Sequence, residues 1–109
     1  MIASLNSNPG EAERKAYLRN MKARLSEKKG RLGFIKRKIE RATASHRIQV
    51  SEQLLRAEFH ADSSLEELRA QLELLEKTDD ESWLAKRYDV DVAWDELSQA
   101  VKKVVARFP

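Results

Sequence analysis

The sequence of 109 residues has no cysteine and very little proline, glycine or aromatic side chain. The absence of cysteine excludes a disulfide scaffold, a cysteine-ligated zinc site and a thiol nucleophile. The two prolines stand at positions 9 and 109, and a loop-rich β fold would need more of them in between. No apolar run approaches the roughly 20 residues that a membrane span needs. The composition therefore predicts an all-α protein.

The first residues suggest a tail and then the start of a helix. They contain neither the basic nor the apolar segment of a secretory signal peptide, so we expect a cytoplasmic protein. Asn8 can cap a helix, Pro9 suits the first helical position, and Glu11 stands where a capping box needs a carboxylate. We expect residues 1–8 to form a flexible tail.

Apolar residues then recur every three or four positions, which is typical of one face of a helix. The first seam has coiled-coil spacing and is interrupted only at Lys28. Further along, the spacing changes to an eleven-residue repeat that keeps Ile39, Val50, Ala61 and Leu72 in one phase. We therefore expect one long helix over about residues 9–76. The first seam consists of Leu18, Met21, Leu25, Leu32, Ile35 and Ile39.

A polar run over residues 76–82 interrupts the apolar stripe. Thr78 and Glu81 have the spacing of a capping box, which favours the start of a new helix. We expect a break at about 77–80 and a second helix over about 80–108. No glycine or proline marks this turn and the eleven-residue phase continues through it, so one continuous helix remains the alternative.

The last segment is the most apolar part of the chain, and it ends in a stripe that includes Trp94, Leu97 and Val101. Trp94 lies in the densest part of this stripe, so we expect it to be mostly buried. Trp83 lies near the break and should be more exposed. The expected architecture is a long helix followed by a shorter one, either as a coiled coil or as a helical hairpin that oligomerises.

Charge is divided unevenly along the chain. Residues 1–41 hold twelve basic and four acidic side chains, whereas residues 42–109 hold nine basic and fourteen acidic ones. Two parallel copies of the first seam would bring like charges together, whereas an acidic partner helix would relieve the repulsion. The basic residues that flank the seam are Lys22, Arg24, Lys29, Arg31, Lys36 and Lys38.

The expected break leaves the first seam without a partner. A second helix that folds back at 77–80 covers only about residues 48–77. We therefore expect a homo-oligomer, in the simplest case an antiparallel dimer in which each basic arm lies along the acidic end of the other copy. The interface would contain the first seam together with Trp94, Leu97 and Val101.

The sequence contains no pattern that indicates catalysis. His46 lies on the apolar face and is expected to be a partly buried helix residue. Glu58, His60 and Asp62 are two residues apart, so on a helix they point away from one another. The chain also lacks the Glu-x-x-His pairs of di-iron bundles and the glycine pattern of phosphate loops. We expect a non-enzymatic protein with no catalytic residue, metal or cofactor.

The basic segment 14–41 allows a different function. Nucleic-acid binding is typical of basic helices, but this one carries an apolar seam and few aromatic side chains for base stacking, so specific nucleic-acid binding is not expected. An anionic membrane surface is a possible partner, although the seam is narrower than the face that lipid binding favours. The alternative function is thus peripheral binding of an anionic membrane or polyanion.

The tryptophans carry a resemblance to a known family. Trp83 follows Thr78-Asp-Asp-Glu-Ser, Trp94 lies in Ala93-Trp-Asp-Glu-Leu97, and the chain nears its end with Ala106-Arg-Phe108. This pattern resembles the short bacterial stress-response coiled-coil proteins. The resemblance implies a long charged helix, a polar break, a terminal helix and an association with stress. The function expected from the sequence is therefore a self-assembling coiled-coil interaction or scaffold protein.

Overall fold

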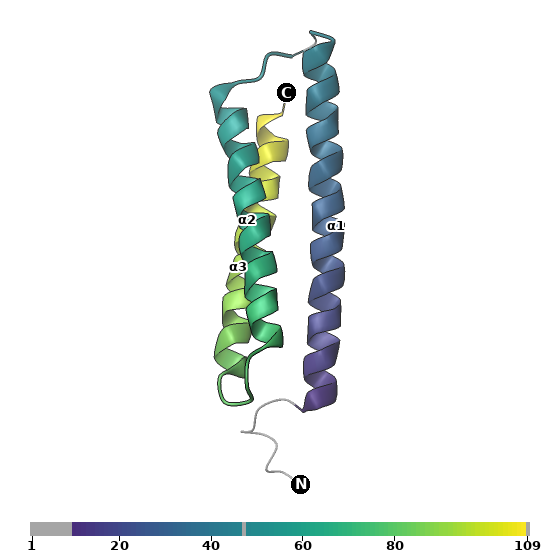
Figure 1. The fold of residues 1–109 in the computed structure, drawn as a ribbon. Helices are drawn as coiled ribbons and strands as arrows, with labels where there is room; N and C mark the ends of the chain where they lie inside the picture. The colour runs from purple at the N-terminus through teal and green to yellow at the C-terminus, as the bar shows by residue number, and fades with distance from the viewer. Residues whose placement is uncertain (1–9, 47, 109) are drawn as a thin grey trace.

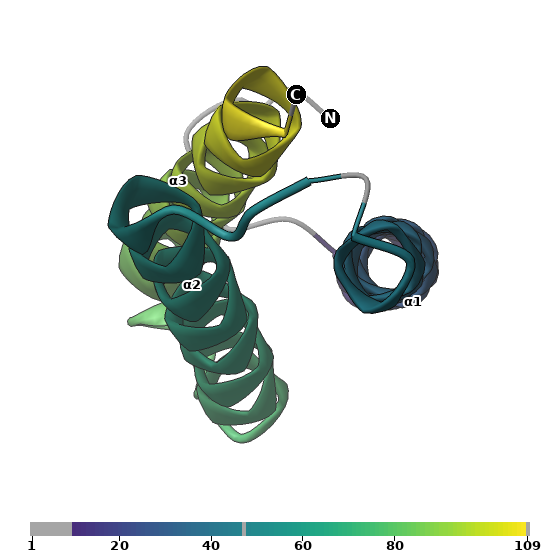
Figure 2. The same ribbon diagram turned by 90° about the horizontal axis from the view of Figure 1, so that it is seen from above.

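The computed structural model describes residues 10–46 and 48–108 as three α-helices. Helix α1 spans Glu11–Ala44, α2 spans Glu52–Glu76 and α3 spans Trp83–Arg107. Helix α1 stands beside the α2–α3 pair, and the chain ends near the α1–α2 connection (Figure 1). Viewed along α1, the other two helices are inclined to it (Figure 2). The bundle measures 64 × 21 × 19 Å. The expected all-α class is confirmed.

The single helix expected over residues 9–76 is wrong, because the chain turns between Ala44 and Glu52. His46 has a φ of 60°, the left-handed conformation in which many helices end. Its backbone N–H donates to the Thr43 carbonyl, and the N–H of Ser45 donates to the Arg41 carbonyl. His46 is therefore an exposed turn residue, and the expectation of a partly buried helical histidine is also wrong.

Helix α2 begins where Ser51 caps it. The Ser51 hydroxyl accepts a hydrogen bond from the backbone N–H of Leu54 at 3.0 Å. Such a cap satisfies one of the amides that the first turn of a helix leaves free. Just before the cap, Ile48 and Val50 are half-buried against an apolar cluster. The turn therefore combines a helix cap with apolar packing.

The second connection lies between Glu76 and Trp83, with different contacts from those expected. The Thr78 hydroxyl donates to the Leu74 carbonyl of the preceding helix, at 2.6 Å. The backbone N–H of Ser82 donates a hydrogen bond to the carboxylate of Asp79, at 3.0 Å. The expected Thr78–Glu81 capping box is thus replaced by an aspartate that spans the turn.

Helix α1 begins at Glu11, with Gly10 in the cap position and no side-chain cap. The expected cap at Asn8, the proline at position 9 and the tail over residues 1–8 lie outside the described residues. Helix α1 buries four of its 34 residues, whereas α3 buries seven of its 25. The α2–α3 pair is therefore the more tightly packed part of the bundle.

The core consists of two apolar clusters, one toward each end of the bundle. Helix α1 contributes Met21 to the first cluster, and Leu32 and Ile39 to the second. Buried alanines on α2 and α3 have small side chains, which favour close approach of the two helices. The other members of the first cluster are Leu68, Leu72, Leu75, Trp83, Val90, Ala93, Leu97 and Val101, and those of the second are Leu54, Ala61, Ala100 and Val104.

The expected exposure of the two tryptophans is reversed. Trp83 is only 2% exposed and lies in the first cluster, where its ring meets that of Tyr17 edge to face at 5.6 Å. Trp94 is only partly buried, and basic side chains of α1 lie over its ring. The linear sequence places Trp83 beside a break, but that break is packed against the first turns of α1.

Replacing Trp83 by alanine should destabilise the protein more than the same change at Trp94. Loss of a fully buried tryptophan leaves a large cavity, and we expect Trp83→Ala to lower the free energy of unfolding by about 3–5 kcal/mol. Trp94→Ala should lower the free energy of unfolding by less than half as much as Trp83→Ala, because the Trp94 ring is already partly exposed to water. Urea unfolding followed by circular dichroism measures both values, and a larger loss at Trp94 would contradict the packing described here.

Candidate functional site: the basic face of α1

Helix α1 carries most of the positive charge and lies against a more acidic part of the chain. It has twelve basic and four acidic residues, whereas α2 has two basic and seven acidic ones. Lys22 binds Glu76 at 2.6 Å, and Lys36 binds Asp62 at 2.9 Å. Arg14 pairs with Asp80 in the second connection. Charge complementarity thus operates within one chain at three positions of α1, between residues 14 and 36.

Tyr17 links α1 to α3. Its hydroxyl donates a hydrogen bond to Asp91 at 2.5 Å, and the guanidinium of Arg87 lies 4.8 Å from the centre of its ring. Burial, together with the hydrogen bond and the negative charge of Asp91, raises the pKa of Tyr17 above its ordinary value. The phenol therefore stays protonated at neutral pH and acts as a donor that holds the two helices together.

The nine apolar residues expected at an interface between copies all pack within this chain. On α1, Met21, Leu32 and Ile39 are buried, and the other three seam residues are partly buried against the same clusters. On α3, Leu97 and Val101 are buried in the first cluster, and Trp94 packs against it. The dimer was inferred from a seam without a partner, and α2 and α3 supply that partner.

The six expected basic residues have different environments. Lys22 and Lys36 form the ion pairs with α2, and Lys29 lines a groove beside that helix. Lys38 lies over the ring of Phe34, 5.4 Å from its centre. Arg24 and Arg31 line the hollow around Trp94. The expected basic patch is therefore divided. Lys22 and Lys36 hold α1 against α2, whereas Arg24, Arg31 and Lys38 form no ion pair with the described residues.

A hollow of about 260 Å³ lies between α1 and α3. Its wall is the indole of Trp94, with the Lys28 amine 5.0 Å and the Arg24 guanidinium carbon 5.9 Å from the ring centre. Cations over the face of an indole are attracted by its π electrons. Arg31 and Glu27 complete the lining. Three cations and one carboxylate thus surround one half-exposed aromatic ring, which favours an anionic ligand.

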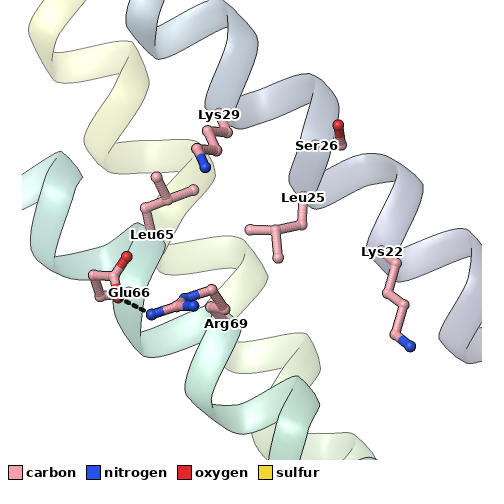
Figure 3. Close-up of a pocket in the computed structure, with 7 residues that line it drawn as sticks. All are labelled: Lys22, Leu25, Ser26, Lys29, Leu65, Glu66 and Arg69. Carbon is pink, nitrogen blue, oxygen red and sulfur yellow. Dashed lines mark hydrogen bonds and ion pairs between the residues drawn. The ribbon is translucent and has the colours of Figure 1, made fainter.

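A larger groove, of about 450 Å³, lies between α1 and α2. Leu25 of α1 and Leu65 of α2 extend toward each other across it (Figure 3). Arg69 binds Glu66 beside Leu65, at 2.8 Å, and the Lys29 amine lies near the same leucine. The floor is apolar and the rim carries both signs of charge, so this groove has less preference for anions than the hollow at Trp94.

The structure places no cluster of metal-ligand side chains among the residues that it describes. His46 lies in the first connection and His60 on α2, and both are exposed. Asp62 binds Lys36, and Asp91 accepts a hydrogen bond from the Tyr17 hydroxyl. These carboxylates serve to join helices. In the same described part of the chain, no helix is long and apolar enough to span a membrane.

Sequence reasoning missed the partners that define this face. Tyr17 and Asp91 are far apart in sequence, and neither stands in a recognisable motif. The position of Trp94 beneath Arg24 and Lys28 depends on how α1 is placed against α3. The acidic character of residues 52–96 was the available signal for Asp62 and Glu76, but it pointed to another copy as readily as to the same chain.

Comparison with protein-family models, with curated protein sequences and with solved structures found no match for this chain. The resemblance to stress-response coiled-coil proteins therefore stays a prediction from the residues that carry it.

Anionic quenchers should reach Trp94 more readily than cationic ones. In a Trp83→Phe variant, Trp94 is the sole tryptophan, and the surrounding cations should attract iodide and repel caesium. We expect the Stern–Volmer constant for iodide to exceed that for caesium about threefold or more at low ionic strength. Lys28→Gln should reduce the ratio and added salt should abolish it. Equal quenching by both ions would show that the cations do not surround the ring.

Glu58 should destabilise the folded protein at neutral pH. Burial is the main reason that the pKa of Glu58 is raised, and the negative charges of Asp62 and Glu40 add to it, whereas Lys36 opposes it. A carboxyl with a raised pKa stabilises the fold when protonated, and this contribution is lost as the pH rises through the raised value. Glu58→Gln should therefore increase the free energy of unfolding at pH 7.

The gain from Glu58→Gln should shrink as the pH falls through the raised pKa of Glu58, because the carboxyl of the parent protein then takes up its proton. Urea unfolding at several pH values measures this difference, and Glu96→Gln on an exposed part of α3 is the control. A gain that does not change with pH would show that the charge of Glu58 is not its cause.

Proposed function

We propose that this protein is a non-enzymatic helical interaction module that binds an extended polyanion through the outward cations of α1. One observation carries the proposal. Among the described residues, eight cations of α1 have no ion-pair partner, although acidic side chains are plentiful in the rest of the chain. They are Arg19, Arg24, Lys28, Lys29, Arg31, Arg37, Lys38 and Arg41.

The spacing of these cations suits an extended ligand. Arg24, Arg31 and Lys38 are seven residues apart, which is close to two helical turns, so they lie in one row along α1. At about 1.5 Å per residue, the row is roughly 20 Å long. A polymer with regularly spaced negative charges would meet all three cations and would pass the hollow at Trp94.

The apolar side chains of α1 argue against insertion into lipid. Leu18, Met21 and Leu32 face the α2–α3 pair, and Phe34 is the large apolar residue of α1 that is exposed. A helix that lies in a membrane needs a broad apolar face directed toward the lipid. Adsorption to an anionic membrane would therefore be electrostatic, weak and sensitive to salt, with none to a neutral membrane.

The scaffold function expected from the sequence has less support than polyanion binding. Its self-assembly depended on an uncovered seam, and that seam is covered by α2 and α3. The outward cations form no ion pair with the described residues, so anion binding is the function that this surface favours. A cytoplasmic location and a link to stress belong to the proposal and rest on the sequence alone.

Two matched double variants test the proposal. Arg24→Glu with Arg31→Glu removes two cations of the row, and Lys102→Glu with Lys103→Glu removes two exposed cations of α3. Each pair changes the formal net charge from +3 to −1. Calorimetric titration with long-chain inorganic polyphosphate should show a loss of affinity of about tenfold or more for the α1 variant and of less than about threefold for the α3 variant.

The affinity of the parent protein should also fall steeply as salt is added. Anionic and neutral vesicles provide the second arm, in which polyphosphate should compete with the anionic vesicles. Equal losses in the two variants would show that net charge, not the row on α1, controls binding. Tight binding to neutral vesicles would favour an apolar membrane contact and contradict the proposal.

A further inference from the structure

Helix α1 joins the rest of the described bundle through one connection, residues 45–51. This connection contains neither glycine nor proline, so its residues are compatible with a helix. Helix α1 is also the least buried of the three helices. The position of α1 therefore depends on whether this connection is a turn or a continuation of the helix.

The apolar pattern is continuous across the connection. Ile39, Val50, Ala61 and Leu72 follow one another at intervals of eleven residues. Eleven residues make almost three whole turns, so these residues would share one face of a straightened helix. In such a helix, the stripes of α1 and α2 would form one continuous stripe. The α2 part would keep α3 as its partner, and the α1 part would need the α2–α3 pair of a second copy.

The contacts between α1 and α2 are arranged symmetrically about the connection. Lys22 and Glu76 lie 27 residues on either side of position 49, and Lys36 and Asp62 lie 13 residues on either side of it. Two straightened chains that cross at position 49 in antiparallel orientation would bring together the same pairs, now between copies. Both the apolar contacts and the ion pairs can therefore be transferred without a change of register.

His46 supplies a reason for the connection to straighten. Among the described residues other than glycine, it alone has a positive φ. A side chain makes this conformation unfavourable, whereas a continuous helix would give His46 the ordinary helical value. The turn has a compensating contact, the hydrogen bond by which Ser51 caps α2, and a continuous helix would lose this cap. The two forms therefore differ mainly in the connection itself.

We propose that two copies of this chain exchange α1, so that each α1 packs against the α2–α3 pair of the other copy. The connection becomes helical in both copies, and α1 and α2 form one helix. This helix would span 66 residues, from 11 to 76, or about 100 Å at 1.5 Å per residue. The single-chain form has a longest dimension of 64 Å. Exchange of an element between identical chains is an economical way to form a dimer.

Glu52→Pro should suppress the exchanged dimer. Residue 52 is the first residue of α2, a position that accepts proline, and Ser51 before it has the extended backbone that proline requires, with ψ 159°. In a continuous helix, the same proline would stand in the interior and break it. Glu52→Ala is the control, because it removes the same exposed carboxylate without the ring.

His46→Ala should have the opposite effect, because alanine disfavours the left-handed turn and favours a helix. Light scattering coupled to size-exclusion chromatography, over a range of protein concentrations, measures the dimer fraction. We expect this fraction to rise about threefold or more in His46→Ala, to fall by a similar factor in Glu52→Pro and to be unchanged in Glu52→Ala. Circular dichroism verifies that each variant is folded, and small-angle scattering should show the dimer to be longer than the monomer.

Carbodiimide cross-linking identifies which copies are in contact. Protein labelled with ¹⁵N and unlabelled protein are unfolded together, refolded and cross-linked between Lys36 and Asp62. Exchange predicts linked peptides in which one partner is labelled and the other is not. The proposal would be overturned if, in every cross-linked pair from the dimers, both peptides were labelled or both were unlabelled. Dimers that Glu52→Pro leaves unaffected, or parent and His46→Ala proteins that stay monomeric at every concentration, would also overturn it.

Discussion

The burial of one apolar stripe of α1 against the α2–α3 pair is the contact on which the rest of the structure depends. Met21, Leu32 and Ile39 are buried in it, and they determine which side of α1 faces inward. Once that side is covered, the remaining positions of the helix must meet water, and most of them are charged. The way in which the narrow seam is covered therefore decides which charged residues of α1 are exposed at the surface.

Electrostatic contacts orient this packing and contribute little to its strength. The pairs of Lys22 with Glu76 and of Lys36 with Asp62 are partly hydrated, and such pairs stabilise proteins by about 0–1 kcal/mol each. Their effect lies in the choice of neighbour, because a basic helix beside an acidic one avoids the repulsion of like charges. The hydrogen bond from Tyr17 to Asp91 has the same effect between α1 and α3.

The two proposals arise from different parts of the same helix. Polyanion binding uses cations that form no ion pair with the described residues, such as Arg24 and Arg31 beside Trp94. Exchange of α1 uses the inward face and would keep the pairs of Lys22 with Glu76 and of Lys36 with Asp62, now between copies. Outward cations remain outward in both forms, so a dimer would present two basic rows instead of one.

The sequence by itself determined the helical class, the apolar stripes, a polar break after Glu76 and the separation of charge. These properties depend on residue type and spacing, which are local. It did not reveal the turn at 45–51, because the apolar pattern repeats at the helical period on both sides of Ser45–Ser51 and neither glycine nor proline marks the change. Serine is a residue type that favours helix N-caps, but Ser51 alone does not outweigh the continuous apolar pattern.

Tertiary structure alone decided which surface covers the seam, and with it the exposure of the tryptophans and the partners of Lys22 and Lys36. An apolar stripe on a helix indicates which face must be buried, but it does not specify which other helix covers that face. That choice depends on contacts between residues far apart in the chain, such as Tyr17 with Trp83. These contacts stabilise the protein only after the chain has folded back on itself.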